Sequence, residues 1–595
     1  MQRSNLRLSV AAAAVILAAV GVAVAQRPQP FTQIMRYNQT EGTTARFDAQ
    51  RTGWVRLDHF IAPEKMTGFA LQWKTKLANT PSSGAALSGG IVTSGGLGIT
   101  LAFLGAQGNR TIAIDMDNGH AFFNRIYSEA PAVARSGACF SASLATPTRT
   151  TPLTPPMPGP PTPAGQAAVG PNSQLPYSSV IGAPGEGVPA VKPGSYFATP
   201  GSFFGANGAK PYDGTPASAI AGTAFAATGQ GGGFGRGRGA AGRSGGRGGP
   251  VNADGGFAAP GASGAARGGG GGGGRGAFSA PNATYAISND GVLHGLTLHD
   301  GLDGIQPIPF LPAGAQASDL TLIDGTLYTS TMNGCGGVPN GVWAIAPTAI
   351  PAGGTFPKPL SWLTGGTADP HAPSFNADGL MFVTVGSGTG SFADSVVSLD
   401  PATLAVKNKF TAPGANFAAS ATILREGDED LVAAQTADGR IFLFDGATLG
   451  APLATSPAIA GAGVWKPAGL AGWKDATGQL WLLSTSPASV DAWKITLTGN
   501  SATLTRAWTL PGLKSPLAPM VINGVVFACS TGDAATPAVL FAVDGVTGKK
   551  LWDSGKTITR SVPRSSAIWN SMGQVLVGAS DSTLYAFGAN MERHL

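Results

Sequence analysis

The chain has 595 residues, of which 88 are glycine and 45 are proline, and only 12% carry a charge. This length excludes a single small domain, and the composition is typical of many short strands joined by turns rather than of long helices. The net charge of +6 resides in a basic segment at 230–277 and in the first residues, so the rest of the chain is close to neutral and lacks the basic face that nucleic-acid binding requires.

The first 25 residues have the three parts of a secretory signal peptide. Arg3 and Arg7 form a basic start, residues 10–20 form an apolar run, and residues 23–25 read Ala-Val-Ala, which suits signal peptidase. An uncleaved anchor helix is the less favoured alternative, because the apolar stretch is shorter than the roughly 20 residues that span a bilayer. We therefore predict an exported protein of the periplasm or the extracellular space, with no transmembrane span after cleavage.

The regular sequence pattern stops between residues 146 and 280. The first part of this segment is rich in proline and threonine, and the later part is rich in glycine, alanine and arginine. Such sequence cannot bury enough apolar surface to offset the cost of ordering its backbone, so we predict a long disordered insert. Its Arg-Gly-Gly elements at 247–249 and 267–269 look like those of RNA-binding tails, but a flexible linker is the favoured interpretation in an exported protein, with adhesion to an anionic surface polymer as a weaker one.

Outside the insert the sequence repeats itself with a period of about 50 residues. Each unit has an apolar strand, a second strand that ends at a small or acidic residue, a turn, and a further strand that often bears tryptophan or phenylalanine. The end of the second of these strands is marked by Asp115, Asp300, Ala346, Asp400, Asp445, Thr496, Asp544 and Gly588. Eight landmarks at this period predict an all-β fold, an eight-bladed β-propeller.

The first strand of the repeat region has the character of the strand that the last unit lacks. The last unit lacks its outer strand, and residues 69–77, which include Trp73, form an isolated strand of that character. We expect this N-terminal strand to pair with the last blade and close the ring through Trp73. The expected parts are then a signal peptide (1–25), a lead-in (26–67), the closing strand with the first blade (68–145), the insert (146–280) and the remaining blades (281–590).

A longer motif within one repeat resembles that of a known family. Residues 542–552 match the tryptophan-docking motif A-x-D-x-x-T-G-K-x-x-W of the pyrroloquinoline-quinone (PQQ) dependent dehydrogenases and related quinoprotein-type propellers. Degenerate copies begin at Asp400 and Asp445, and residues 51–73 resemble the N-terminal approach of the family. The resemblance covers the chain outside the leader and the insert.

The resemblance implies structural roles for the residues of this motif. Trp552 is expected to pack between neighbouring blades, because a large flat ring buries much area at a seam between two sheets. Asp544 and Thr547 are expected to tie the turn by local hydrogen bonds, and Gly548 is free to take a positive φ before the next strand.

The resemblance also raises the question of quinone chemistry. The dehydrogenases of the family hold PQQ in the central channel with Ca²⁺ bound by acidic and amide side chains, above a tryptophan and below a disulfide between adjacent cysteines. This sequence has no Cys-Cys dipeptide, and its calcium and catalytic carboxylates cannot be matched residue by residue. We therefore assign no catalytic residue and no metal ligand, and leave the cofactor-binding residues unknown.

The cysteines and histidines offer few further candidates. Cys139 and Cys335 lie in loop-like stretches and could pair in an oxidising compartment, which the sequence leaves open. Cys529 lies in an apolar strand and is interpreted as a small buried hydrophobe. His371 and His59 are interpreted as ordinary loop histidines rather than metal ligands.

Two functions remain. The favoured one is a monomeric, non-enzymatic binding or scaffold propeller that engages a protein or an envelope component, in the branch of the resemblance that includes the propeller of the outer-membrane assembly machinery. The alternative is a PQQ- and Ca²⁺-dependent dehydrogenase that oxidises an alcohol or a sugar.

Overall fold

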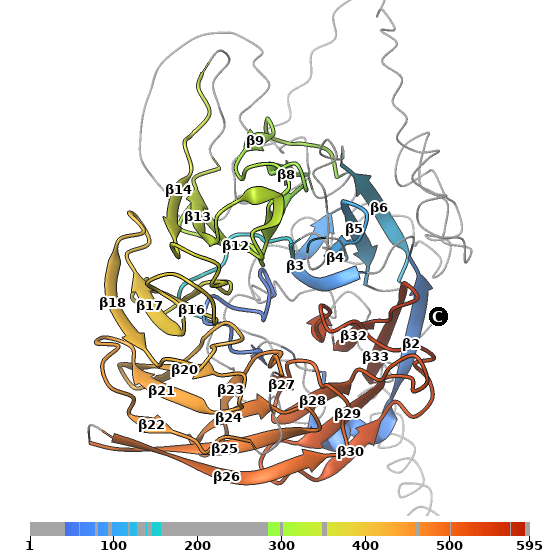
Figure 1. The fold of residues 1–595 in the computed structure, drawn as a ribbon. Coiled ribbons are helices and arrows are strands. Elements are labelled where there is room, and N and C mark those ends of the chain that lie inside the picture. The colour runs from blue at the N-terminus through green and yellow to red at the C-terminus, as the bar shows by residue number, and fades with distance from the viewer. Residues whose placement is uncertain are drawn as a thin grey trace, which may run out of the picture.

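The computed structural model describes residues 42–56, 58, 60–77, 81–92, 98–116, 119–127, 139, 145–155, 284–297, 301–347, 354–459, 465–499, 501–571 and 573–589. The predicted signal peptide, His59 and the part of the predicted insert from 156 to 280 lie outside these residues. Eight β-sheets stand around a common axis, as Figure 1 shows, so the predicted eight-bladed propeller is confirmed.

The first four blades follow one another along the chain. Their strands are β3 (Pro81–Val92), β4 (Gly98–Ala106), β5 (Arg110–Asp115) and β6 (Ala121–Ile126) in blade 1; β7 (Thr284–Ile287), β8 (Val292–Leu296) and β9 (Ile308–Pro309) in blade 2; β10 (Gln316–Ala317), β11 (Thr321–Ile323), β12 (Thr326–Met332), β13 (Gly341–Ile345) and β14 (Leu360–Leu363) in blade 3; and β15 (Ser374–Phe375), β16 (Met381–Val385), β17 (Ser395–Leu399) and β18 (Val406–Thr411) in blade 4.

The second half of the ring is more regular. Its strands are β19 (Thr422–Glu426), β20 (Glu429–Gln435), β21 (Ile441–Asp445) and β22 (Ala454–Thr455) in blade 5; β23 (Ala471–Lys474), β24 (Leu480–Thr485), β25 (Ser489–Thr498) and β26 (Ser501–Pro511) in blade 6; β1 (Trp54–Val55), β27 (Met520–Ile522), β28 (Val525–Ser530), β29 (Val539–Asp544) and β30 (Lys550–Asp553) in blade 7; and β2 (Phe69–Lys76), β31 (Trp569–Ser571), β32 (Gln574–Gly578) and β33 (Thr583–Ala589) in blade 8. Two short 3₁₀ turns, η2 (Pro63–Gly68) and η5 (Cys335–Gly337), are the named helical elements. Within the described ranges, no helix has the length and apolar character needed to cross a membrane.

The ring closes as predicted, through the N-terminal strand. Strand β2 pairs antiparallel with β33, with Trp73 opposite Ala586 and Lys74 opposite Tyr585. The landmarks of the repeat fall at or next to the ends of the third strands, for example Asp115 in β5 and Asp544 in β29, while Asp300 lies outside the described residues. Counted from the ring axis, the strand that the sequence analysis took as second is therefore third.

Residues 146–155, which the sequence analysis assigned to the insert, belong to the propeller. Thr148 forms a β-bridge with Tyr285 of β7, and Thr150 bridges Leu322 of β11. The segment thus supplies the inner edge of blade 2, and the predicted boundary at 146 is wrong by about ten residues. Threonine-rich sequence was interpreted as low complexity, although threonine is also a favourable strand residue.

The antiparallel order of the strands gives the ring two different faces. Connections from one blade to the next and loops between second and third strands lie on one face, here called the loop face. Turns between third and fourth strands lie on the other, here called the turn face.

The free cysteine is buried in blade 7. Cys529 lies in β28 opposite Leu540 and has no exposed surface. Burial raises the pKa of its thiol to about 12, so about one molecule in 10⁴ carries the reactive thiolate at pH 8. We expect the native protein to resist a maleimide at pH 8 and to take up one equivalent once unfolded in urea. Rapid stoichiometric labelling of the native protein, followed by mass spectrometry, would contradict this burial.

Candidate functional site at the ring axis

The lead-in segment lies along the inner edges of the blades. An innermost strand has a free edge, and its backbone N–H groups require acceptors when they are buried. In blades 4 to 7 these acceptors are successive carbonyls of the lead-in: Phe375 donates to Ala49, Ile423 to Gln50, Gly472 to Thr52 and Val521 to Gly53. The segment therefore circles the axis and meets the blades in the order of the chain.

Both ends of this segment extend the circle. At blade 3 the Thr44 hydroxyl donates to the carbonyl of Leu320 (2.7 Å). At blade 8 the Asp58 carboxylate accepts from the Gly573 N–H and the Asn570 amide, both at 2.9 Å. Six consecutive blades are thus bonded to one stretch of fewer than twenty residues.

Two arginines, the half-buried Arg46 and the buried Arg51, join the lead-in to several blades. Arg46 donates to the carbonyls of Pro519 and Leu470, in front of blades 7 and 6. Burial lowers the pKa of Arg46 to about 10, against the opposing effect of Asp48. Arg51 is 2% exposed, and its buried guanidinium likewise has a lowered pKa.

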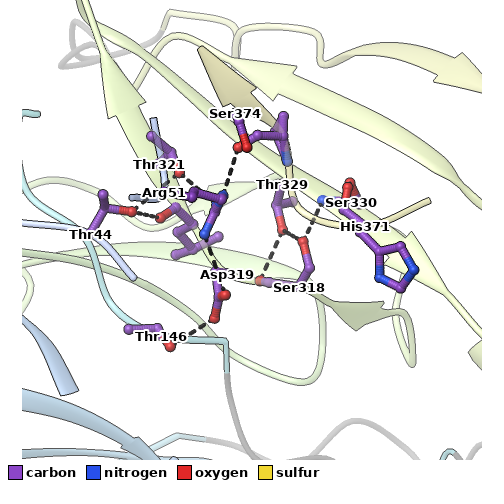
Figure 2. Close-up of polar contacts among 12 residues, drawn as sticks. Thr44, Arg51, Thr146, Ser318, Asp319, Thr321, Thr329, Ser330, His371 and Ser374 are labelled. Carbon is purple, nitrogen blue, oxygen red and sulfur yellow. Dashed lines mark hydrogen bonds and ion pairs between the residues drawn. The ribbon is translucent and has the colours of Figure 1, made fainter. Parts of the chain in front are cut away.

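Arg51 is the centre of a polar network between blades 2, 3 and 4. Figure 2 shows its guanidinium pointing at Asp319, with Thr321 beside it. Its Nε donates to the Pro373 carbonyl at 2.8 Å, its Nη2 to the Thr321 hydroxyl at 3.1 Å, and its Nη1 lies 3.5 Å from an Asp319 oxygen. Asp319 also accepts from Thr146 (2.8 Å). One planar fork therefore holds three parts of the ring together.

His371 belongs to the same region and ties loops together. Its backbone N–H donates to Thr384, its carbonyl accepts from the Ser330 hydroxyl, and its Nε2 donates to the Phe417 carbonyl at 3.1 Å. Burial lowers the pKa of this imidazole. These contacts join blades 3, 4 and 5 and support the interpretation of His371 as a loop histidine.

Comparisons with known proteins bear on this architecture. No protein-family model and no curated protein matches the sequence. Among solved structures, a quinohemoprotein alcohol dehydrogenase from Comamonas testosteroni is 12% identical, with 97% of this chain and 85% of that chain covered at a TM-score of 0.50. A europium-containing methanol dehydrogenase is 9% identical, with 93% and 99% covered at a TM-score of 0.51.

The chain has the fold of the quinoprotein propellers. BamB from Moraxella catarrhalis also matches, at 13% identity over 52% of this chain and 94% of that chain, but with a TM-score of 0.34. Identities of this size show the fold alone, so the function of the quinoprotein-like propeller has to be argued from its own residues.

Three carboxylates near the axis of the quinoprotein-like propeller have hydrogen-bond partners within the protein. Asp48 accepts hydrogen bonds from the Thr52 N–H and hydroxyl and from Arg56 (2.7 Å). Asp58 accepts hydrogen bonds from blade 8. Asp319 accepts hydrogen bonds from Thr146 and Arg51. These carboxylates are thus engaged by the protein's own donors. Among the described residues, no group of three or more histidine, cysteine, aspartate or glutamate side chains is placed to hold a metal ion.

The residues of the docking motif lie in the turn and seam that the resemblance implies. Asp544 accepts from the Thr547 N–H and hydroxyl, both at 2.7 Å, and Gly548 has φ = +71°. Trp552 packs edge-on against Phe69 (centroids 5.0 Å apart) and against Phe587 (5.4 Å), both in blade 8.

The sequence analysis did not identify the tryptophan ring that packs against this turn from the preceding blade. The indole of Trp508 in blade 6 donates to the Gly545 carbonyl of blade 7 at 2.9 Å, and a Cβ on Gly548 would lie 2.8 Å from its ring. The ring of Trp73 in blade 8 packs against Gly119 in blade 1 in the same way, and a Cβ on Gly119 would lie 2.3 Å from it. The rings of Trp508 and Trp73 thus each cover a glycine turn of the following blade, a contact that a repeat pattern within single blades cannot reveal.

A disulfide joins two loop-face segments of the propeller. Cys139, in the connection from blade 1 to blade 2, is bonded to Cys335, in the loop between β12 and β13 of blade 3. The sequence left this pairing open. The same loop is anchored by Asp369, which accepts from the Asn333 N–H (2.7 Å) and the Asn340 amide (2.9 Å).

A Ser-His-Asp set between blades 1 and 2 also escaped the sequence analysis. His294 Nε2 lies 3.1 Å from the Ser288 hydroxyl, and its Nδ1 lies 2.9 Å from Asp303, which pairs with Arg125 of blade 1. Ser288 is 3% exposed and also bonds Asp290 and the Val292 carbonyl within its own turn. A buried serine held in this way ties the seam and is no nucleophile.

Proposed function

We propose that this quinoprotein-like propeller is an exported, non-catalytic binding or scaffold protein of the periplasm or cell envelope, which recognises a protein or an envelope component through its loop face. The observation that carries the proposal is the lead-in segment: it lies along the inner edges of six blades, and its arginines and carboxylates are engaged by the blades or by the lead-in itself. The lead-in segment, here called the axial brace, thus stabilises the ring by bonding its blades to one another along the axis.

The loop face has what recognition requires. Loops on a rigid ring vary without disturbing the core beneath them. Here they are fixed by the Cys139–Cys335 disulfide and by reciprocal backbone-to-hydroxyl bonds between Thr367 and Thr389. Preorganised loops lose less conformational entropy when a partner binds.

Crosslinking from the two faces tests this proposal. A photo-reactive amino acid is placed at Ser391, an exposed loop-face residue, or at Val546, a turn-face residue that is 46% exposed. In cells that produce the protein, we expect a discrete crosslinked species from position 391 and none from position 546. Equal patterns from both positions would contradict recognition through the loop face.

A second arm addresses the PQQ- and Ca²⁺-dependent alternative. Purified protein is incubated with PQQ and Ca²⁺ and assayed for reduction of an artificial dye with alcohols and sugars. We expect no turnover above a sample without protein. Stoichiometric PQQ binding with turnover would replace the scaffold function with the dehydrogenase.

A further inference from the structure

Arginines stacked on aromatic rings recur in this propeller, and they share a feature. Five such pairs occur among the described residues. In four of them the guanidinium also pairs with an aspartate: Arg56 on Trp54 with Asp48, Arg125 on Tyr127 with Asp303, Arg440 on Phe442 with Asp438, and Arg506 on Trp493 with Asp491. The ring covers one face of the guanidinium, and the carboxylate accepts from the N–H groups at its edge.

Arg564 is the exception. Its guanidinium lies 5.3 Å from the centroid of Trp465 and donates to the Lys466 carbonyl, but no carboxylate of the described chain pairs with it. Burial lowers the pKa of Arg564. Arg564 is nevertheless exposed to solvent, so an anion from outside the chain can reach the edge of the guanidinium that aspartate occupies in the other four pairs.

Neighbouring donors are also left without acceptors. The indole N–H of Trp465 is buried and has no hydrogen-bond partner, and the hydroxyl of Ser566, a residue 7% exposed, has none either. A buried donor without an acceptor costs about 1–3 kcal/mol, which a bound acceptor would recover.

These residues lie on the loop face. Trp465 and Lys466 belong to the connection from β22 to β23, and Arg564 and Ser566 belong to the connection from β30 to β31. The two connections meet although two complete blades, 6 and 7, separate them along the chain. The charge of Lys466 also contributes to the lowered pKa of His371.

We infer that Arg564, Trp465 and Lys466 form a carboxylate-binding site for an acidic side chain or the C-terminal carboxylate of a partner polypeptide. A carboxylate is favoured because it matches the planar fork and because aspartate fills this place in the other four pairs. The inference rests on the proposed function, since it names the chemistry that the loop face would recognise.

Titration with defined probes tests the site. The probe is acetyl-triglutamate amide, compared with sodium acetate and inorganic phosphate at equal ionic strength, and binding is followed by calorimetry. We expect saturable binding of the peptide that weakens about 10- to 100-fold in Arg564→Gln. Arg506→Gln, which removes a stacked arginine that has its own aspartate, should leave binding unchanged.

The other outcomes are equally decisive. Equal affinity in Arg564→Gln and the native protein would overturn the site, and so would acetate or phosphate binding as tightly as the peptide. If the peptide result fails while the crosslink from position 391 persists, the loop face still binds a partner but without this carboxylate site. If the peptide binds and no crosslink forms, the site stands and the proposed function fails.

Discussion

Gly119→Ala is expected to destabilise the propeller by displacing the strand that closes the ring. Gly119 has φ = +75°, and a Cβ there would lie 2.3 Å from the ring of Trp73 and 2.6 Å from the Thr75 hydroxyl. Both residues lie in β2, the strand that closes the ring. The methyl group therefore pushes out the tryptophan whose indole donates to Gln574 (3.0 Å) and to the Met116 carbonyl (3.2 Å).

The expected loss of unfolding free energy in Gly119→Ala has two parts, and a control variant can separate them. Left-handed backbone costs a residue with a side chain about 1–2 kcal/mol, and displacing a packed ring adds about 1–3 kcal/mol. Gly524→Ala carries only the first part, because φ is +79° there and nothing lies within 4 Å of an added Cβ.

The urea midpoint of maleimide labelling at Cys529 measures both variants, since Cys529 and Trp73 belong to one apolar cluster. Gly119→Ala should be labelled at clearly lower urea than Gly524→Ala. Coincident midpoints would show that Trp73 does not depend on this turn.

The repeat and the closing strand were predictable because they rest on local chemistry. A turn such as 544–548 needs an acidic residue, a hydroxyl and a glycine within five positions, and all three are visible in the sequence. Ring closure followed because the last unit lacked one strand and the first strand had no unit of its own. The boundary of the insert failed because the strand at 146–150 is short, rich in threonine and pairs with residues across the inserted segment.

The axial brace was not predictable, because its partners are distant in sequence. Ala49, Gln50, Thr52 and Gly53 accept bonds from residues more than 300 positions away, and backbone carbonyls leave no mark in side-chain patterns. The arginines of the lead-in are spaced without a helical or strand period, so the sequence pattern assigns them no role. A buried arginine becomes recognisable only when the topology brings carbonyls and carboxylates around it.

Substitution of Arg51 is expected to lower the free energy of unfolding, because its guanidinium holds the axial brace to the region where blades 2, 3 and 4 meet. Arg51→Met keeps most of the volume but leaves the Pro373 carbonyl without its donor and Asp319 without its guanidinium. Breaking a buried pair on one side costs about 3–5 kcal/mol. Because the Asp319 side chain is 36% exposed and can be hydrated, we expect a lower loss, about 2–4 kcal/mol.

Two further variants show whether the shape of the fork or only its charge matters. Arg51→Lys keeps the charge, but a single ammonium group cannot reach Pro373, Thr321 and Asp319 together, so most of the loss should remain. Arg440→Met removes an arginine that is 35% exposed and whose partner Asp438 is 39% exposed, and it should cost less than about 1 kcal/mol. Urea denaturation at pH 7, followed by tryptophan fluorescence, compares the three. Full stability of Arg51→Lys would reduce the role of Arg51 to a point charge, and full stability of Arg51→Met would show that the ring holds together without the brace.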